Sequence, residues 1–278
     1  IILKFILYDL IQQRFNLPRL EELDIGRLEH IFREAYKVSK IQAIRPSWID
    51  SSFSLIDESE LRDIFREAIK IIKRPSKTDI LGHVYEELIP QEERRRLGEF
   101  YTPRPIAEFM VKWAIRTPDC LVLDPGVGSG TFLIEGLYRL ESLGLSSIMA
   151  SSRLYGIDIN PLAVLMATIN ILRHVPSALP RIFQFDFLKL TPQKAHELGF
   201  DKSSFHAVVC NPPYTRHHEL SPCYKEEIAR IIETEIGEPI SRLSSIYLHF
   251  LIHAFRFLRD SGRLAFIIPS EWMESDYG

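Results

Sequence analysis

The stretch Leu121-Val122-Leu123-Asp124-Pro125-Gly126-Val127-Gly128-Ser129-Gly130-Thr131-Phe132 combines three local signals. Its apolar start is typical of a short buried strand, and the glycines that follow indicate a tight turn. Apolar residues at helical spacing begin near residue 130. The stretch therefore predicts a strand that passes through a glycine turn into a helix, which is the repeating unit of doubly wound α/β folds.

The same alternation continues on both sides of this stretch, from Gly98 onward. We predict strands at residues 121–123, 154–157, 182–185, 207–210 and 264–268, and helices near 104–115, 130–143, 161–174 and 241–259. Alternating strands and helices predict a doubly wound, mostly parallel sheet with helices on both faces. Ligands of such sheets bind at the carboxyl ends of the strands.

Residues 1–97 instead predict a helical N-terminal region. Apolar residues recur at helical spacing over residues 20–40 and 57–72. Asp79 is suited to cap a third helix that runs to Leu88, where Pro90 stops it. We therefore expect two parts, a helical region over 1–97 and an α/β domain over 98–278.

Composition limits the class of protein. The 278 residues are 46% hydrophobic and 26% charged, as in ordinary globular proteins. No apolar run approaches the about 20 residues that cross a bilayer, and residues 1–10 lack the flanks of a signal peptide. Three cysteines cannot form a disulfide framework, which favours the cytoplasm. The net charge of −3 argues mildly against DNA binding, but a local basic stripe is compatible with it.

The glycine turn has two candidate ligands. A nicotinamide dinucleotide site needs the spacing G-x-G-x-x-G, whereas here Gly130 follows Gly128 and Thr131 stands in the third glycine place. Asp124 precedes the glycines, where a carboxylate would repel a pyrophosphate but suits the cationic amino acid end of S-adenosylmethionine. The alternative is a plain tight turn.

Two further acids follow predicted strands. Asp158 ends the second strand and could accept hydrogen bonds from both ribose hydroxyls; alternatively it caps the helix that begins near Pro161. Asp186 follows the third strand and could accept from the amine of the cofactor adenine, with Phe187 beside the ring. Its alternative is a turn aspartate between core phenylalanines.

The fourth strand ends in Asn211-Pro212-Pro213-Tyr214. The prolines make a stiff corner without N–H donors, which exposes the Asn211 side-chain oxygen and the Pro212 carbonyl as acceptors. Two acceptors on the hydrogens of an aromatic amine would free its lone pair for attack on a sulfonium methyl. Tyr214 offers a stacking face for an extruded base. The alternative is a strand-terminating turn.

Together, Phe100-Tyr101-Thr102-Pro103, the glycine turn, Asp158, Asp186 and Asn211-Pro212-Pro213-Tyr214 resemble the N6-adenine DNA methyltransferases of restriction-modification systems, in the gamma order of motifs. The run 81–86 resembles the lead-in of the large modification polypeptides of this family. The resemblance implies S-adenosylmethionine as cofactor and double-stranded DNA as substrate. The implied catalytic residues are Asn211, Pro212, Pro213 and Tyr214. The implied cofactor contacts are Phe100, Tyr101, Thr102, Pro103, Asp124, Pro125, Gly126, Gly128, Gly130, Asp158, Ile159, Asp186, Phe187 and Asn211.

The family continues beyond the fifth strand with a second aromatic wall for the base and a target recognition domain. We therefore expect the domain to be truncated at its C-terminal end, with target recognition supplied by a domain or specificity subunit outside these residues. The alternatives are a glutamine-amide protein methyltransferase, an RNA adenine methyltransferase, and a non-catalytic cofactor-holding or subunit-docking module. Residues 100–103 and the Asp124-Pro125 start of the turn favour the DNA family.

We expect no metal site. Cys210, Cys223, His217 and His218 lack the spacing of metal-ligand motifs. The basic run Arg94-Arg95-Arg96 is compatible with phosphate contacts or with a solvated helix face.

Overall fold

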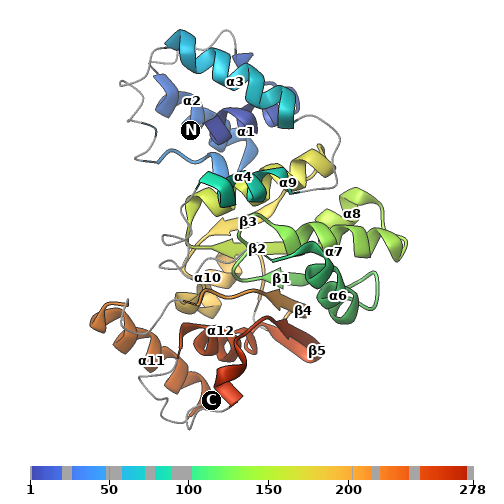
Figure 1. The fold of residues 1–278 in the computed structure, drawn as a ribbon, viewed down its shortest axis with the longest axis vertical. Helices are drawn as coiled ribbons and strands as arrows, with labels where there is room; N and C mark the ends of the chain where they lie inside the picture. Colours follow the sequence, from blue (N-terminus) through green and yellow to red (C-terminus); the bar gives the residue numbers. More distant parts are fainter. Residues whose placement is uncertain are drawn as a thin grey trace.

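A five-stranded parallel sheet forms the centre of the structure, a computed structural model that describes residues 2–20, 27–47, 50, 58–72, 79–88, 102–201, 203–214, 220–237 and 245–273 (Figure 1). The strands are β1 (Val122–Asp124), β2 (Leu154–Asp158), β3 (Arg181–Gln184), β4 (Phe205–Cys210) and β5 (Leu258–Phe266). Their order is β3-β2-β1-β4-β5. The order reverses between β1 and β4, and this reversal creates a ligand-binding switch point there.

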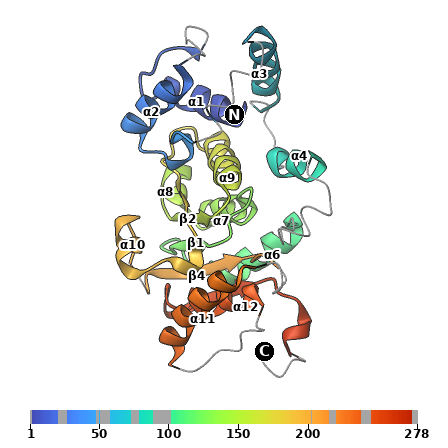
Figure 2. The same cartoon turned by 90° about the vertical axis from the view of Figure 1, so that its left-hand side faces the viewer.

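Both faces of the sheet are buried, because consecutive strand residues point to opposite sides. In β1, Val122 packs into one hydrophobic core and Leu123 into the other, and neither side chain is exposed. Three helices cover the first face: α6 (Arg104–Ala114), α7 (Thr131–Ser142) and α9 (Pro161–His174). Three helices cover the second face (Figure 2): α10 (Pro192–Glu197), α11 (Pro222–Ile236) and α12 (Ile246–Ala254). The predicted doubly wound α/β fold is confirmed.

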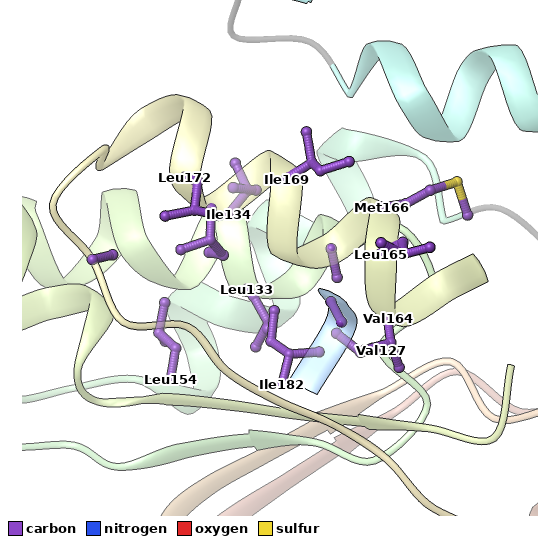
Figure 3. Packing of buried hydrophobic residues seen from close by; sticks show 14 of the residues in the cluster. Val127, Leu133, Ile134, Leu154, Val164, Leu165, Met166, Ile169, Leu172 and Ile182 are labelled. Atoms are coloured by element: carbon purple, nitrogen blue, oxygen red, sulfur yellow. The ribbon is translucent and has the colours of Figure 1, made fainter. Parts of the chain in front are cut away.

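The glycine turn is anchored in the first core. Val127, between two of its glycines, is buried and lies beside Val164 of α9 (Figure 3). Every residue of α9 from Ala163 to Leu172 is buried, because this helix packs against the sheet on one side and against α1 on the other. The turn between β1 and α7 is therefore fixed by the packing of Val127 in the first core.

Helices also form the described part of residues 1–97, as predicted. They are α1 (Ile2–Gln12), α2 (Leu28–Ser39), the short 3-10 helix η3 (Gln42–Ile44), α3 (Glu58–Ile72) and α4 (Ile80–Leu88). The predicted cap of α4 is confirmed, because Asp79 Oδ1 accepts from the Gly82 N–H at 2.8 Å. The apolar first residues form α1, which buries Phe5, Leu7 and Tyr8. No helix among the described residues combines the length and apolarity that a membrane span requires.

The boundary between the last helix and the last strand differs from the prediction. We predicted a helix to residue 259 and a strand from 264, but α12 ends at Ala254 and β5 begins at Leu258. Ser261 adopts a left-handed φ of 63°, and the pairing of β4 with β5 shifts register around it. This bulge hides the alternation that identifies a strand.

Three short or polar helices were not predicted. They are α8 (Ser147–Ser151), α10 and α11. Each begins with an N-cap serine or threonine whose side chain accepts a hydrogen bond from a backbone N–H; the caps are Ser146, Thr191 and Ser221, respectively. The capping residues were the available signal in the sequence. The apolar faces of these three helices are too short or too weak to display a helical period.

Candidate functional site

The carboxyl ends of four neighbouring strands bring the predicted polar residues to one edge of the sheet. Asp124 and Asp158 are the last residues of β1 and β2. Asp186 follows β3, and Asn211 follows β4. Parallel strands place these ends side by side. The acids of the site thus lie at the ends of β1, β2 and β3. The Asn211 amide lies at the end of β4, on the other side of the switch point between β1 and β4.

Asp158 holds the glycine turn. Its Oδ2 accepts from the Gly128 N–H at 2.9 Å, and its Oδ1 accepts from the Asn160 N–H at 2.9 Å. The cap of α9 is Asn160, whose side-chain oxygen accepts from the Leu162 N–H at 2.9 Å. Asp158 is therefore not the cap of α9, and its carboxylate faces the turn.

Two glycines of the turn meet specific requirements. A Cβ on Gly126 would lie 3.2 Å from Cys210 Sγ and 3.6 Å from the Asn211 carbonyl oxygen, so the turn passes close to the end of β4. Gly128 has a φ of 51°, and a Cβ there would meet no atom within 4 Å. The backbone at Gly128 is left-handed and open on the side from which a ligand can approach.

Asp124 is fully buried, and its carboxylate is only partly satisfied. Oδ1 accepts from the Gly126 N–H at 3.2 Å, whereas Oδ2 has no hydrogen-bond partner among the described residues. Burial raises the pKa of Asp124 well above its usual range, and the charge of Asp158 adds to this increase. A buried carboxylate oxygen without a donor is costly. The cationic ammonium of S-adenosylmethionine would supply both the donor and the charge, so this group fits the site.

Asp186 makes the contact expected of a turn aspartate. Its Oδ1 accepts from the Leu188 N–H at 3.1 Å and caps the 3-10 helix η5 (Phe187–Lys189), as a turn aspartate does. The hydroxyl of Tyr224 also donates to it at 3.4 Å. Burial raises the pKa of Asp186. Sequence reasoning missed Tyr224, which reaches this position because Ser221 caps the unpredicted helix α11.

Phe187 does not lie where the adenine interpretation places it. The side chain is 2% exposed, and its ring centroid lies 5.3 Å from that of Phe250 and 5.5 Å from that of Phe257. The ring is thus a core residue of the second face. By contrast, Ile159 is 65% exposed beside Asp158, where an apolar side chain can contact a ligand.

Asn211 is held on both sides of its amide. Its Nδ2 donates to Thr102 Oγ1 at 3.1 Å, and its Oδ1 accepts from the Tyr214 hydroxyl at 2.5 Å. The Tyr214 hydroxyl also lies 2.8 Å from the Ile267 carbonyl oxygen. Burial raises the pKa of Tyr214 to about 12. Thr102 was predicted to line the cofactor pocket; the structure places its hydroxyl on the amide of Asn211.

Other predicted residues have simpler positions. Pro103 is the N-cap residue of α6, Gly130 is that of α7, Pro125 and Pro212 are buried, and Pro213 is half-buried. Phe100, Tyr101, His217, His218 and the run 94–96 lie outside the described residues. No cluster of three metal-ligating side chains occurs within the described ranges.

Comparison with known proteins gives a family match and several relatives. Residues 76–276 match the family model described as N-6 DNA Methylase. The chain is 26% identical over 195 residues to the type II methyltransferase M.AccI of Acinetobacter calcoaceticus, which covers 70% of this chain and 32% of the relative. It is 30% identical over 187 residues to M.XamI of Xanthomonas campestris pv. amaranthicola, covering 66% and 32%. The chain thus spans about a third of the length of these relatives.

A longer match and two solved structures agree with this result. The MpnII type I methylase subunit of Mycoplasma pneumoniae is 26% identical over 267 residues, covering 91% of this chain and 46% of the relative. The type IIG restriction endonuclease BpuSI superposes with a TM-score of 0.62 at 17% identity, over 97% of this chain and 31% of that chain. A type I methyltransferase subunit from Streptococcus thermophilus gives 0.57 at 21% identity, over 95% and 56%. At these identities the structures show a common fold.

Proposed function

Because the chain belongs to the N-6 DNA methylase family, we propose that it transfers a methyl group from S-adenosylmethionine to the N6 amine of adenine in double-stranded DNA, within a restriction-modification system. One observation carries the proposal: Asp124, with an unpartnered buried oxygen, lies in the same strand-end cluster as Asn211, whose amide is fixed by Thr102. Gly126 lies between the two, since a Cβ there would lie 3.2 Å from Cys210 Sγ and 3.6 Å from the Asn211 carbonyl oxygen. A site for a cation and a site for an amine are therefore adjacent.

We assign the cofactor contacts from this geometry. The Asp124 carboxylate would pair with the ammonium group, and the open backbone at Gly128 would lie against the methionine end. Asp158 would accept from the ribose hydroxyls, because its carboxylate lies at the end of β2 beside the glycine turn and a carboxylate can accept several hydrogen bonds at once. When bound, the cofactor supplies a methyl group activated by its sulfonium.

The adenine end of the cofactor would lie toward β2 and β3. Ile159 offers an exposed apolar side chain to the ring, and Asp186 offers an acceptor to the ring amine. The Tyr224 hydroxyl would either keep its hydrogen bond to Asp186 alongside the ring amine or be displaced by that amine. The remaining assignments stay part of the proposal on the strength of the family motifs: Phe100, Tyr101, Thr102, Pro103, Pro125, Gly126 and Gly130.

The residues at the end of β4 would act on the target base. Asn211 Oδ1 and the Pro212 carbonyl would accept from the two hydrogens of the adenine amine, which makes its nitrogen lone pair available. Thr102 Oγ1 accepts from Asn211 Nδ2 and so fixes the orientation of the amide. The rigid corner at Pro213 fixes the backbone, and the ring of Tyr214 would stack on the extruded base.

Partners and organisation follow from the same proposal. Residues 98–278 would form the catalytic domain, with the helical region 1–97 packed on it through α1 and α9. DNA would be held by a target recognition domain or a specificity subunit in addition to this chain, because a net charge of −3 provides no electrostatic excess for phosphate. We place the reaction in the cytoplasm.

The test is a methyl-transfer assay of the intact protein with labelled S-adenosylmethionine. Four acceptors are compared: unmethylated DNA, the same DNA already methylated on adenine N6, RNA of equal sequence, and a translation factor with a glutamine target. We expect label on unmethylated DNA alone, with N6-methyladenine identified by mass spectrometry of the nucleosides. Asn211→Ala is the matched control, because it should bind cofactor without transferring the methyl group.

Each rival function has its own outcome in this assay. Label on the translation factor and none on DNA would establish the glutamine-amide activity, and label on RNA would establish an RNA enzyme. Cofactor binding without transfer to any acceptor would favour a non-catalytic module. Binding of NAD in place of S-adenosylmethionine would overturn the assignment of the glycine turn.

A further inference from the structure

Asp79 links the helical region to the glycine turn. It precedes α4, and its Oδ2 accepts a short hydrogen bond from Ser129 Oγ, which lies fifty residues later between Gly128 and Gly130. The same oxygen lies 3.4 Å from Thr131 Oγ1. A side chain of the lead-in to the domain thus contacts the loop to which we assign the cofactor.

The other oxygen of Asp79 reaches α4 and α9. Oδ1 accepts from the Gly82 N–H at 2.8 Å and from Asn170 Nδ2 at 2.7 Å. Asn170 is 1% exposed and donates from the same nitrogen to the Ser129 carbonyl oxygen at 2.9 Å. Asp79 therefore holds the side chain of Ser129, and Asn170 holds its backbone.

The network extends to α3. Arg173 donates from Nη1 to Asn170 Oδ1 at 3.3 Å and from Nε to the carbonyl oxygen of Ile72, the last residue of α3, at 2.8 Å. On the opposite side of the turn, Asp158 holds the Gly128 N–H. The segment from Gly128 to Ser129 is thus fixed between strand β2 and helices of the N-terminal region.

Gly82 makes room for this link. A Cβ at Gly82 would lie 2.3 Å from Asp79 Oδ2 and 2.7 Å from Ser129 Oγ. The hydrogen bond between carboxylate and hydroxyl therefore occupies the volume that any side chain at this position would take. A glycine is otherwise unfavourable inside a helix, by about 1 kcal/mol relative to alanine.

We propose that Asp79 is a positioning residue for the cofactor loop: together with Asn170 it fixes Ser129, and through it the Gly128 backbone against which the methionine end of S-adenosylmethionine lies. This inference rests on the proposed function of the site. The link between Asp79 and Ser129 makes the start of α4 part of the cofactor site, although α4 precedes every strand in the sequence. The competing explanation is that Asp79 only caps α4.

Two substitutions separate the roles. Asp79→Ser keeps a good N-cap but is too short to reach Ser129, so it breaks the link and spares the helix. In Gly82→Ala the added methyl would lie 2.3 Å from Asp79 Oδ2 and 2.7 Å from Ser129 Oγ, so the carboxylate and the hydroxyl must move apart. Positioning predicts that both variants lose cofactor affinity. Capping alone predicts that neither variant changes affinity.

The experiment is calorimetric titration of the chain with S-adenosylhomocysteine, the demethylated cofactor, together with thermal unfolding. We expect affinity to fall about tenfold in Asp79→Ser and in Gly82→Ala, the scale for losing one hydrogen bond to a charged group. Ser129→Ala should also lose affinity, and the double variant Asp79→Ser/Ser129→Ala should lose less than the sum of the two single losses, because both single variants remove the bond between Asp79 and Ser129. Ser146→Ala, which removes the cap of α8, is the matched control and should leave affinity within twofold, about 0.4 kcal/mol.

Unchanged affinity in Gly82→Ala and Asp79→Ser overturns the inference, as does additive loss in the double variant. Should Asp79→Ser fail to fold, Ser129→Ala still decides, because it removes the hydrogen bond to Asp79 and leaves the bond between Asp79 and the Gly82 N–H in place. A wild-type chain that does not bind S-adenosylhomocysteine overturns the proposed function, which is a different result from equal binding by wild type and variants.

Discussion

The hydroxyl of Tyr214 donates to the side-chain oxygen of Asn211, with 2.5 Å between the two oxygens. The Ile267 carbonyl oxygen, just past β5, lies 2.8 Å from the same hydroxyl. A phenol has a single proton, so it can donate to only one of these acceptors at a time. The Asn211 oxygen can therefore exchange Tyr214 for another donor while the tyrosine keeps a partner at Ile267. This is the exchange that an incoming adenine amine requires.

Tyr214→Phe and Tyr214→Ala should differ in their effect on DNA methylation. The phenylalanine keeps the stacking face, and Asn211 Oδ1 then needs no exchange, so kcat and the KM for DNA should stay within about threefold, less than 1 kcal/mol. The alanine loses the face and should weaken base capture by about 1–3 kcal/mol. Steady-state kinetics on DNA, with cofactor affinity as the control, measures both. A phenylalanine variant as impaired as the alanine would show that the hydroxyl itself is needed.

Asn211→Ala should abolish most turnover and leave cofactor affinity intact. The side chain acts on the target amine, and removing one preorganised polar group from a reacting centre costs about 10²-fold or more in kcat. Single-turnover methylation and calorimetry on the same sample give the two quantities. Thr102→Val is a milder companion: it removes only the acceptor for Asn211 Nδ2, so kcat should fall less than in Asn211→Ala. Near-normal methylation by Asn211→Ala would contradict the role of this amide.

The positions of the first four strands and the acids at the ends of the first three could be predicted because both depend on local patterns. Apolar runs that stop at Asp124, Asp158 and Cys210 indicate buried strands, and parallel strands must gather their carboxyl ends. The start of β5 could not be predicted, because the bulge at Ser261 breaks the alternation. Helix α11 could not be predicted because its outer face is charged.

Those parts of the site that depend on distant residues could not be read from the sequence. The bonds from Asp79 to Ser129 and from Asp79 to Asn170 span 50 and 91 residues. Tyr224 reaches Asp186 only through the direction of α11. Phe187 was misplaced because a phenylalanine beside a strand end can face either the ligand or the core, and the packing of Phe250 and Phe257 decides it.

Asp50→Ala should destabilise the N-terminal helices. Lys4 Nζ lies 2.8 Å and 2.6 Å from the two Asp50 oxygens, and the side chains are 6% and 0% exposed. Removing one partner of a buried pair leaves an unpaired charge and costs about 3–5 kcal/mol. Burial already lowers the pKa of Lys4, so part of the cost is relieved when Lys4 loses its proton. Urea unfolding measures the change in the free energy of unfolding.

The exposed pair Arg66–Asp63 provides a control for the Asp50 variant. Its side chains are 60% and 75% exposed, so Asp63→Ala should leave stability unchanged within error. The double variant Lys4→Met/Asp50→Leu should recover most of the lost stability, because it buries no charge and so avoids the desolvation cost. Equal stability of Asp50→Ala and Asp63→Ala would mean that the buried pair contributes no more than a surface pair.

Asp124→Asn should stabilise the chain in the absence of cofactor and weaken cofactor binding. Burial raises the pKa of Asp124 in the folded state above its unfolded value of about 3.9, so the folded state binds more protons. The free energy of unfolding of the wild type therefore falls as pH rises from that value through the folded pKa, where the buried charge forms. The asparagine variant lacks this loss. Thermal unfolding of both proteins between about pH 5 and pH 9 measures the difference.

Below the unfolded pKa of about 3.9 the two proteins should converge, because Asp124 is then protonated in both states, and they should diverge as pH rises from there to the folded pKa. Pairing with the cofactor ammonium requires the carboxylate, so wild-type binding should release protons and tighten with rising pH up to the folded pKa. Calorimetry in buffers of different ionisation enthalpy detects that release. The asparagine variant should release none at this site and bind about 1–3 kcal/mol more weakly, the range for bonds to a charged group. Equal affinity of the two proteins at alkaline pH would mean that Asp124 meets no cationic group and serves only to hold Gly126.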